Sequence, residues 1–184
     1  MKKSILVTGI ICIASIRILA EPTISQVYRI SLTNIDGNSV STADGRISTV
    51  VLVGKSSVDK AREVGDRIPD FCLGNPLYRM VTVVTFESKH SRPVRAFLTS
   101  MIRRRVETEA KRLQARYDQL KITRNARDDV FAMADFDGAI AGQLDAKPGM
   151  TLFRVFIFGK GGELIKQWSD VPTAEDLSAA LKQN

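Results

Sequence analysis

The sequence predicts an α/β domain with a mixed central sheet and helices on both of its faces. Three observations lead to this prediction. After an amino-terminal hairpin, strand-like and helix-like segments alternate, which is the pattern of a sheet covered by helices. Two apolar runs rich in β-branched residues, 48–53 and 79–86, are typical of buried central strands. A glycine-containing turn at 160–162 predicts a closing hairpin, which makes the sheet mixed rather than wholly parallel.

The first predicted elements form the amino-terminal hairpin. Apolar and polar side chains alternate over 27–32, as in a strand with one buried face. Asp36-Gly37 is a strong signal for a tight turn. Residues 39–42 are then the returning strand.

A helix is predicted directly after the strand at 48–53. Ser56 is its expected N-cap, and Asp59 places an acid in the positively polarised first turn. Pro69 helps to end it. Its apolar residues recur every three or four positions and give the helix one apolar face: Val58, Ala61, Val64 and Ile68.

The longest predicted helix covers 93–120 and follows the strand at 79–86. Pro93 suits its first turn, where a missing backbone N–H costs nothing. Its apolar stripe is expected to comprise Val94, Leu98, Met101, Ile102, Val106, Ala110, Leu113, Tyr117 and Leu120.

The remaining elements complete the alternation. The turn at 135–138 leads into a short helix, for which Asp137 is the expected N-cap. The predicted order is a strand at 130–134, this short helix ending near 144, strands at 152–158 and 163–168, and a final helix from 173.

The amino terminus reads as a secretory signal. Lys2 and Lys3 precede an apolar run at 4–16, and Ala20 provides a small residue before a cleavage point. The run is shorter than the roughly 20 residues that span a bilayer. We therefore expect a signal peptide at 1–20, a single domain at 21–184, no transmembrane segment in the mature chain, and export to the periplasm or beyond. An uncleaved amino-terminal anchor is the alternative.

Cleavage at this point changes the charge and the cysteine count. It removes three of the 27 basic residues and none of the 20 acids, so the net charge falls from +7 to +4. It also removes Cys12 and leaves Cys72 alone, which excludes an internal disulfide. We interpret Cys72 as a buried small hydrophobe. A free thiol and one half of an intermolecular disulfide are the alternatives.

Three segments, in this order, resemble the thioredoxin superfamily and its peroxiredoxin-like (AhpC/TSA) branch. They are the hairpin at 30–41, the Asp135-Phe136-Asp137-Gly138 segment, and the closing hairpin at 156–165. Residues 54–57 and the carboxy-terminal third further resemble YtfJ-type periplasmic proteins. The resemblance implies a thioredoxin-like fold. It also implies a reactive cysteine at the start of the helix after the first central strand.

The chain departs from that family at the position where the family's chemistry occurs. A thiolate at a helix start is stabilised by the helix dipole, and a second thiol one turn on resolves the mixed disulfide. This chain has Lys55-Ser56-Ser57 there and no cysteine. Thiol-disulfide and peroxidase activities are therefore not carried over to it.

The sequence instead favours a redox-inactive protein that binds a protein partner or a small anionic ligand. The expected binding residues are Lys55, Ser56 and Ser57 at the helix start, together with Arg103, Arg104, Arg105 and Arg112 on the long helix. The competing interpretation of the long helix is a solvated face laced with ion pairs, such as Glu107 with Lys111. No cofactor and no nucleic acid are expected.

Enzymatic alternatives remain open from sequence alone. Cys72 could serve a monothiol redox enzyme, although it lies beyond the negative end of the first helix, which disfavours a thiolate. His90 could activate Ser56 or Ser57 in a divergent hydrolase. As a lone histidine, His90 makes a dedicated zinc site unfavourable. Residues 130–138 also resemble the aspartate motif of haloacid-dehalogenase-type phosphatases, but too few residues follow to build that fold.

Overall fold

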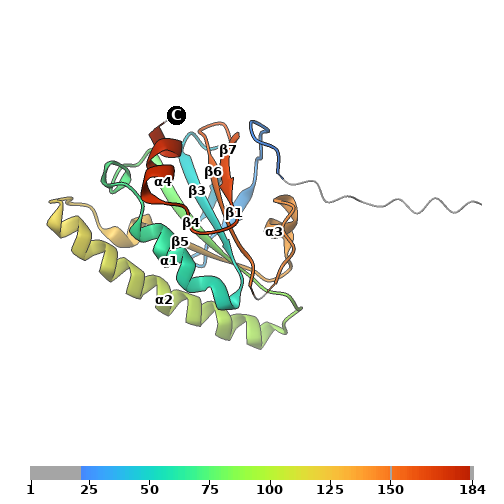
Figure 1. Ribbon diagram of the computed structural model, residues 1–184. Helices are drawn as coiled ribbons and strands as arrows, with labels where there is room; N and C mark the ends of the chain where they lie inside the picture. The colour runs from blue at the N-terminus through green and yellow to red at the C-terminus, as the bar shows by residue number, and fades with distance from the viewer. Residues whose placement is uncertain (1–21, 150, 183–184) are drawn as a thin grey trace, which may run out of the picture.

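The computed structural model describes residues 22–149 and 151–182, and the expected signal peptide at 1–20 lies outside them. In this part of the chain a five-stranded sheet has the order β5-β4-β3-β6-β7 (Figure 1). β3, β4 and β5 pair in parallel, whereas β6 pairs antiparallel with both β3 and the edge strand β7. The predicted mixed sheet is thereby confirmed. The strands are β3 (Ile47–Val53), β4 (Tyr78–Thr85), β5 (Val130–Asp135), β6 (Phe153–Phe158) and β7 (Leu164–Trp168).

The central strand β3 is buried along its whole length because both faces of the sheet are covered. Val51 and Val53 point into a core shared with α1 (Val58–Asp66) and α4 (Ala174–Lys182). Val50 and Leu52 point into a second core on the opposite face. That second core is closed by α3 (Ala139–Gln143) and by the hairpin of β1 (Ser31–Thr33) and β2 (Ser39–Ser41).

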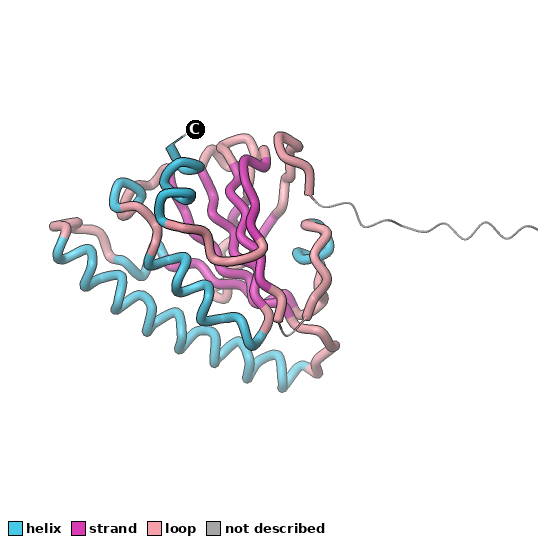
Figure 2. The backbone as a smooth tube through the Cα atoms, viewed as in Figure 1, coloured by secondary structure: helices cyan, strands magenta, loops and turns pink. Residues whose placement is uncertain are grey.

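The longest helix, α2 (Arg92–Gln119), lies beside α1 on the same side of the sheet (Figures 1 and 2). Short 3₁₀ turns link the main elements: Lys55–Ser57, Asp70–Cys72 and Ala126–Asp129. Among the described residues, none of the helices has both the length and the apolar character needed to cross a bilayer.

The apolar stripe predicted for α2 is wrong at both ends. Val106, Ala110 and Tyr117 are buried, whereas Val94, in the first turn, is 42% exposed. Met101, in the interior of the helix, is also 53% exposed. Leu120, just past the helix, is exposed as well. A helix of 28 residues is about 42 Å long, whereas an eight-residue strand spans only about 26 Å. The helix therefore extends past the sheet, and its end residues have no sheet to pack against.

Two predicted helix caps are also wrong. A 3₁₀ turn occupies 55–57, so Ser57 and not Ser56 stands at the N-cap of α1, and its side chain makes no capping hydrogen bond. Gly138, with a left-handed φ of 67°, takes the N-cap position expected for Asp137. The buried carboxylate of Asp135 caps α3 instead, accepting hydrogen bonds from the N–H groups of residues 140 and 141.

The predicted strand at 27–32 is much shorter in the structure. Residues 25–28 run instead alongside the turn between β6 and β7, where the N–H of Tyr28 donates to the carbonyl of Gly162. Val27 forms only an isolated bridge with Glu163. The hairpin strand β1 therefore begins at Ser31.

Candidate functional site

The junction between β3 and α1 lies at the carboxyl end of the parallel strands. The N–H of Gly54 donates to the carbonyl of Leu152 at 2.8 Å, which joins this junction to the loop before β6. Lys55 and Ser56 are exposed, while Ser57 is buried. The junction thus offers an ammonium group and hydroxyl groups, which can bind a ligand but cannot exchange disulfides.

Cys72 is the one free cysteine in the described part of the chain, and it is buried. It lies in the 3₁₀ turn after α1 and packs in the core beneath α1 and α4. Burial raises the pKa of its thiol to about 12, so the reactive thiolate is scarce at neutral pH. Our interpretation of Cys72 as a buried small hydrophobe is confirmed.

His90 belongs to an aromatic cluster that the sequence analysis missed. Its ring contacts Phe86 edge to face, with centroids 5.3 Å apart, and Phe86 stacks on Phe136 at 4.8 Å. Arg95 lies over Phe136 and pairs with Asp137 at 2.6 Å. The Nδ1 atom of His90 is buried and has no hydrogen-bond partner. The available signal was a phenylalanine directly after β4 and another directly after β5, which places both at one end of the sheet.

The arginines of α2 mostly bind acids of the same chain. Arg105 contacts Asp59 at 2.5 Å, while Arg112 contacts both Asp66 and Glu109. The interpretation as an ion-paired face is therefore confirmed for both arginines.

Two details of that face differ from expectation. Glu107 pairs with Arg127 at 2.7 Å and not with Lys111. Arg103 reaches the amino-terminal hairpin, where it contacts Asp36 and the carbonyl of Ile35. Arg104 is exposed and lies outside the cavity described next. The four predicted arginines thus do not form a single surface.

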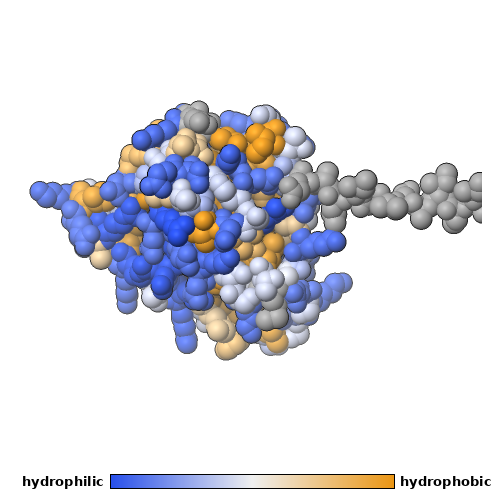
Figure 3. Space-filling model, viewed as in Figure 1, coloured by the Kyte–Doolittle hydropathy of each residue, from blue (hydrophilic) through white to orange (hydrophobic). Residues whose placement is uncertain are grey.

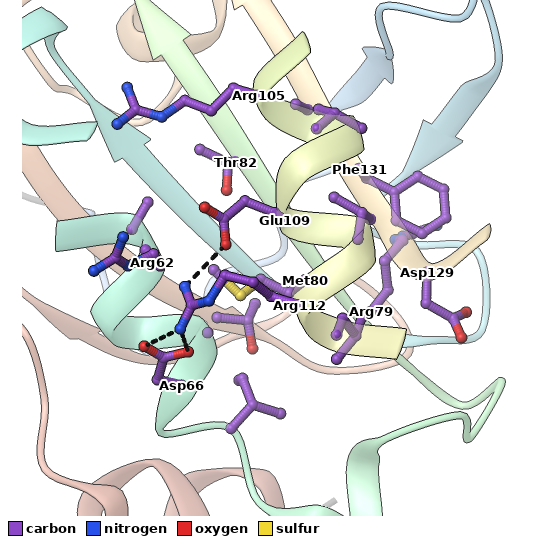
Figure 4. A pocket seen from close by; sticks show the side chains of 18 of the residues that line it. Arg62, Asp66, Arg79, Met80, Thr82, Arg105, Glu109, Arg112, Asp129 and Phe131 are labelled. Carbon is purple, nitrogen blue, oxygen red and sulfur yellow. Dashed lines mark hydrogen bonds and ion pairs between the residues drawn. The ribbon is translucent and has the colours of Figure 1, made fainter. Parts of the chain in front are cut away.

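A cavity of about 700 Å³ lies between α1 and α2, above strand β4 (Figure 4). We call it the α1–α2 cavity. Its floor includes Met80, Thr82 and Val84, which alternate with the fully buried Val81 and Val83 of the opposite face. Its walls are mainly apolar and include Val58 and Gly65 of α1 together with Leu98, Ile102, Val106 and Leu113 of α2.

Three of the predicted binding residues, Lys55, Arg105 and Arg112, line this cavity. Ser56, Ser57, Arg103 and Arg104 do not. The cavity itself could not be found from sequence, because it depends on how far α2 stands from the sheet. Among the described residues, no group of three His, Cys, Asp or Glu side chains could hold a metal ion.

Comparison with known proteins identifies the fold. No family model and no curated protein sequence matches the chain. Among solved structures, it is similar to the exposed lipoprotein thioredoxin Etrx1 of Streptococcus pneumoniae, with 13% identity and a TM-score of 0.51 over 85% of this chain and 99% of that one. It is similar to DsbF of MTB, with 10% identity and a TM-score of 0.53 over 85% and 95% of the two chains.

A third similar structure is a thiol:disulfide interchange protein of the thioredoxin family from Chlorobium tepidum. It shares 11% identity and a TM-score of 0.50 over 89% of this chain and 98% of that one. At such low identities the likeness concerns the fold alone. The chain has a thioredoxin-like fold.

Proposed function

We propose that this chain is an exported thioredoxin-fold protein that binds an anionic ligand or a protein partner and does not exchange thiols. Within the superfamily we place it in the peroxiredoxin-like (AhpC/TSA) branch, with the YtfJ-type periplasmic proteins. One observation carries the proposal: the β3–α1 junction bears Lys55-Ser56-Ser57, while Cys72 is buried beyond the opposite end of α1.

The position of Cys72 argues against a substitute redox centre. The nine residues of α1 alone separate it from the junction by about 14 Å. The raised pKa of Cys72 keeps its thiol protonated, and the thiolate is the form that attacks disulfides and peroxides. A monothiol enzyme that uses Cys72 is therefore disfavoured.

The charges around the α1–α2 cavity favour binding of an anion. Lys55 and Arg62 line it and make no ion pair within the described residues, whereas Arg105 and Arg112 line it while paired with Asp59 and Asp66. Arginine and lysine side chains at the mouth of an apolar cavity recognise acidic groups by charge and by hydrogen bonds. The hydrolase alternative lacks comparable support, because the Nδ1 of His90 is buried among aromatic rings and has no partner.

The test measures thiol chemistry directly. We expect the purified protein to show no insulin reduction and no peroxide turnover, and to react with dithionitrobenzoate only after denaturation. A matched variant carries Ser56→Cys in a Cys72→Ser background. It places one thiol at the exposed junction and should react rapidly in the native state, which shows that the assay detects a thiol there.

The contrary outcome is equally clear. Insulin reduction or peroxide turnover by the wild-type protein that disappears in Cys72→Ser would refute the proposal. Rapid labelling of Cys72 by dithionitrobenzoate in the native protein would also refute the proposal, because it would show that the thiol is accessible and reactive.

A further inference from the structure

We propose that the α1–α2 cavity binds a free long-chain carboxylate, a single-chain amphiphile of the fatty-acid class. The aliphatic chain lies between the helices and the sheet, and the carboxylate lies at the arginine-lined opening. This inference rests on the proposed function, since it names the anionic ligand of that site.

The size and lining of the cavity fit an aliphatic chain. Protein interiors rarely leave voids larger than a water molecule, whereas about 700 Å³ lies within the range of small-molecule sites. Leu98, Ile102 and Leu113 face this space and remain only half-buried. A ligand chain would remove their exposed apolar surface from water, which favours binding.

The lining of the cavity carries more positive than negative charge. Five cationic side chains line it against four carboxylates. This count leaves out Arg79, whose guanidinium binds Asp44 on the opposite side of the sheet. Of the acids on the helices, Asp59 is paired with Arg105 and Asp66 with Arg112. Arg62 lines the same space, is exposed, and makes no ion pair within the described part of the chain. Its guanidinium is available to a carboxylate, which it can bind through two parallel hydrogen bonds.

The arrangement of these arginines favours a thin chain over a larger partner. Figure 4 shows the guanidinium groups of Arg62, Arg105 and Arg112 on the α1 side of the cavity. The pairs Asp59–Arg105 and Asp66–Arg112 cross from α1 to α2. A peptide helix is about 10 Å wide and would have to break both pairs to enter. A polymethylene chain can lie beneath them.

The experiment uses laurate below its micellar concentration as the probe, measured by displacement of 11-(dansylamino)undecanoate from the full-length protein. We expect saturable binding by the wild type. Acetate, which lacks the chain, and dodecyltrimethylammonium, which carries the opposite charge, should compete at least about tenfold less well. Vesicles of phosphatidylglycerol should not displace the probe.

Two variants test the chain site and the head-group site separately. Gly65→Leu places a side chain into the cavity, where an added Cβ would meet only the side chain of Met80, at 3.7 Å. Arg62→Glu reverses the free cation. Each should weaken laurate binding at least about tenfold. Lys111→Glu is the matched control, since it makes the same charge change on an exposed position of α2 outside the cavity, and should stay within about twofold.

Several outcomes would overturn the inference. These are no displacement by laurate, equal competition by dodecyltrimethylammonium, equal weakening by Lys111→Glu, or binding to vesicles alone. Unfolding of Gly65→Leu, checked by circular dichroism, would leave Arg62→Glu as the deciding variant. Failed laurate binding with negative thiol assays refutes only this inference, whereas thiol activity refutes the proposed function whatever laurate does.

Discussion

Arg112 of α2 donates from Nη2 to both carboxylate oxygens of Asp66 on α1, at 3.1 and 3.2 Å. Two further pairs, Asp59–Arg105 and Asp70–Arg116, have the same separation of 46 residues. A constant separation means that the two segments run in the same direction and in register, as successive crossovers on one side of a parallel sheet require. The first two pairs tie α2 to α1, and the Asp70–Arg116 pair ties α2 to the 3₁₀ turn that follows α1. On the face shown in Figure 3, charged and polar residues accordingly predominate, with apolar patches between them.

The Asp66–Arg112 pair should contribute little to global stability. Both side chains are about half exposed, so solvent and salt screen their attraction. We expect Arg112→Ala to lower the free energy of unfolding by no more than about 1 kcal/mol. A double-mutant cycle with Asp66→Ala, measured in urea at low and at high salt, checks this. A coupling energy above about 2 kcal/mol that survives high salt would contradict it.

Gly65→Ala should stabilise the protein. Gly65 lies inside α1, where glycine costs about 1 kcal/mol relative to alanine, and an added Cβ would make ordinary contact with the Met80 side chain. We expect a gain of about 0.5–1 kcal/mol in urea unfolding. Gly74→Ala is the matched control and should destabilise. Gly74 has a φ of +66°, and its added Cβ would lie 2.6 Å from a carbon of Ile122. Equal effects of the two substitutions would contradict this reasoning.

Tyr117→Phe should destabilise the protein by about 1–3 kcal/mol. The Tyr117 hydroxyl donates to the carboxylate of Asp129 at 2.8 Å and accepts from the N–H of Gly74 at 2.9 Å. Phenylalanine keeps the ring packing but leaves the Asp129 carboxylate and the N–H of Gly74 without their hydrogen bonds to the hydroxyl. Denaturant unfolding of the two proteins at pH 7 measures the difference, and a loss below about 0.3 kcal/mol would be inconsistent with a buried two-way hydrogen bond.

The raised pKa of Tyr117 predicts how the stability of the protein responds to alkaline pH. Burial, followed by the bond to Asp129, raises the pKa of Tyr117 from 10.0 to about 12. Because the folded state favours the protonated phenol, this stabilisation is complete below pH 10 and is lost as the pH rises toward 12. Burial of Cys72 acts in the same direction between about pH 9 and 12. Stability should therefore fall from pH 9 to 11, and fall less in the double variant Tyr117→Phe, Cys72→Ser.

The ion pair between Arg79 and Asp44 lies on the side of the sheet opposite the α1–α2 cavity, and its contribution to stability should depend on acidic pH. The Arg79 side chain is only 1% exposed and binds Asp44, the carbonyl of Ser41 and the hydroxyl of Ser48. Burial raises the pKa of Asp44, but the hydrogen bond and charge of Arg79 outweigh this and hold that pKa below 3.8.

Asp44→Ala should therefore lower the free energy of unfolding by about 1–3 kcal/mol at pH 6. This loss is smaller than that expected for a fully buried ion pair, because the Asp44 side chain is partly exposed. The contribution of Asp44 is present above pH 3.8 and is lost as the pH falls through its lower folded pKa. The difference between wild type and variant should shrink in urea titrations below pH 3. A difference that grows there would contradict the assigned ion pair.

Much of the architecture could be predicted from local patterns. The β-branched runs form the central strands β3 and β4, of which β3 is buried along its whole length, and the turn before β7 forms the expected hairpin. Helix caps were less predictable. Ser56 and Asp137 have suitable side chains, but Ser57 and Gly138 occupy the N-cap positions because backbone geometry there depends on the neighbouring strand ends.

By itself the sequence determined the fold class, the order of the elements and the absence of a cysteine at 54–60, because these follow from residue type and short-range periodicity. Only the tertiary structure decided that Lys55, Arg62, Arg105 and Arg112 surround one cavity. It also decided that Cys72 is buried and that the ends of α2 are exposed. The physical reason is distance along the chain. The residues that meet at the cavity are separated by up to 57 positions, and they meet only after α1 and α2 have packed in register over the sheet.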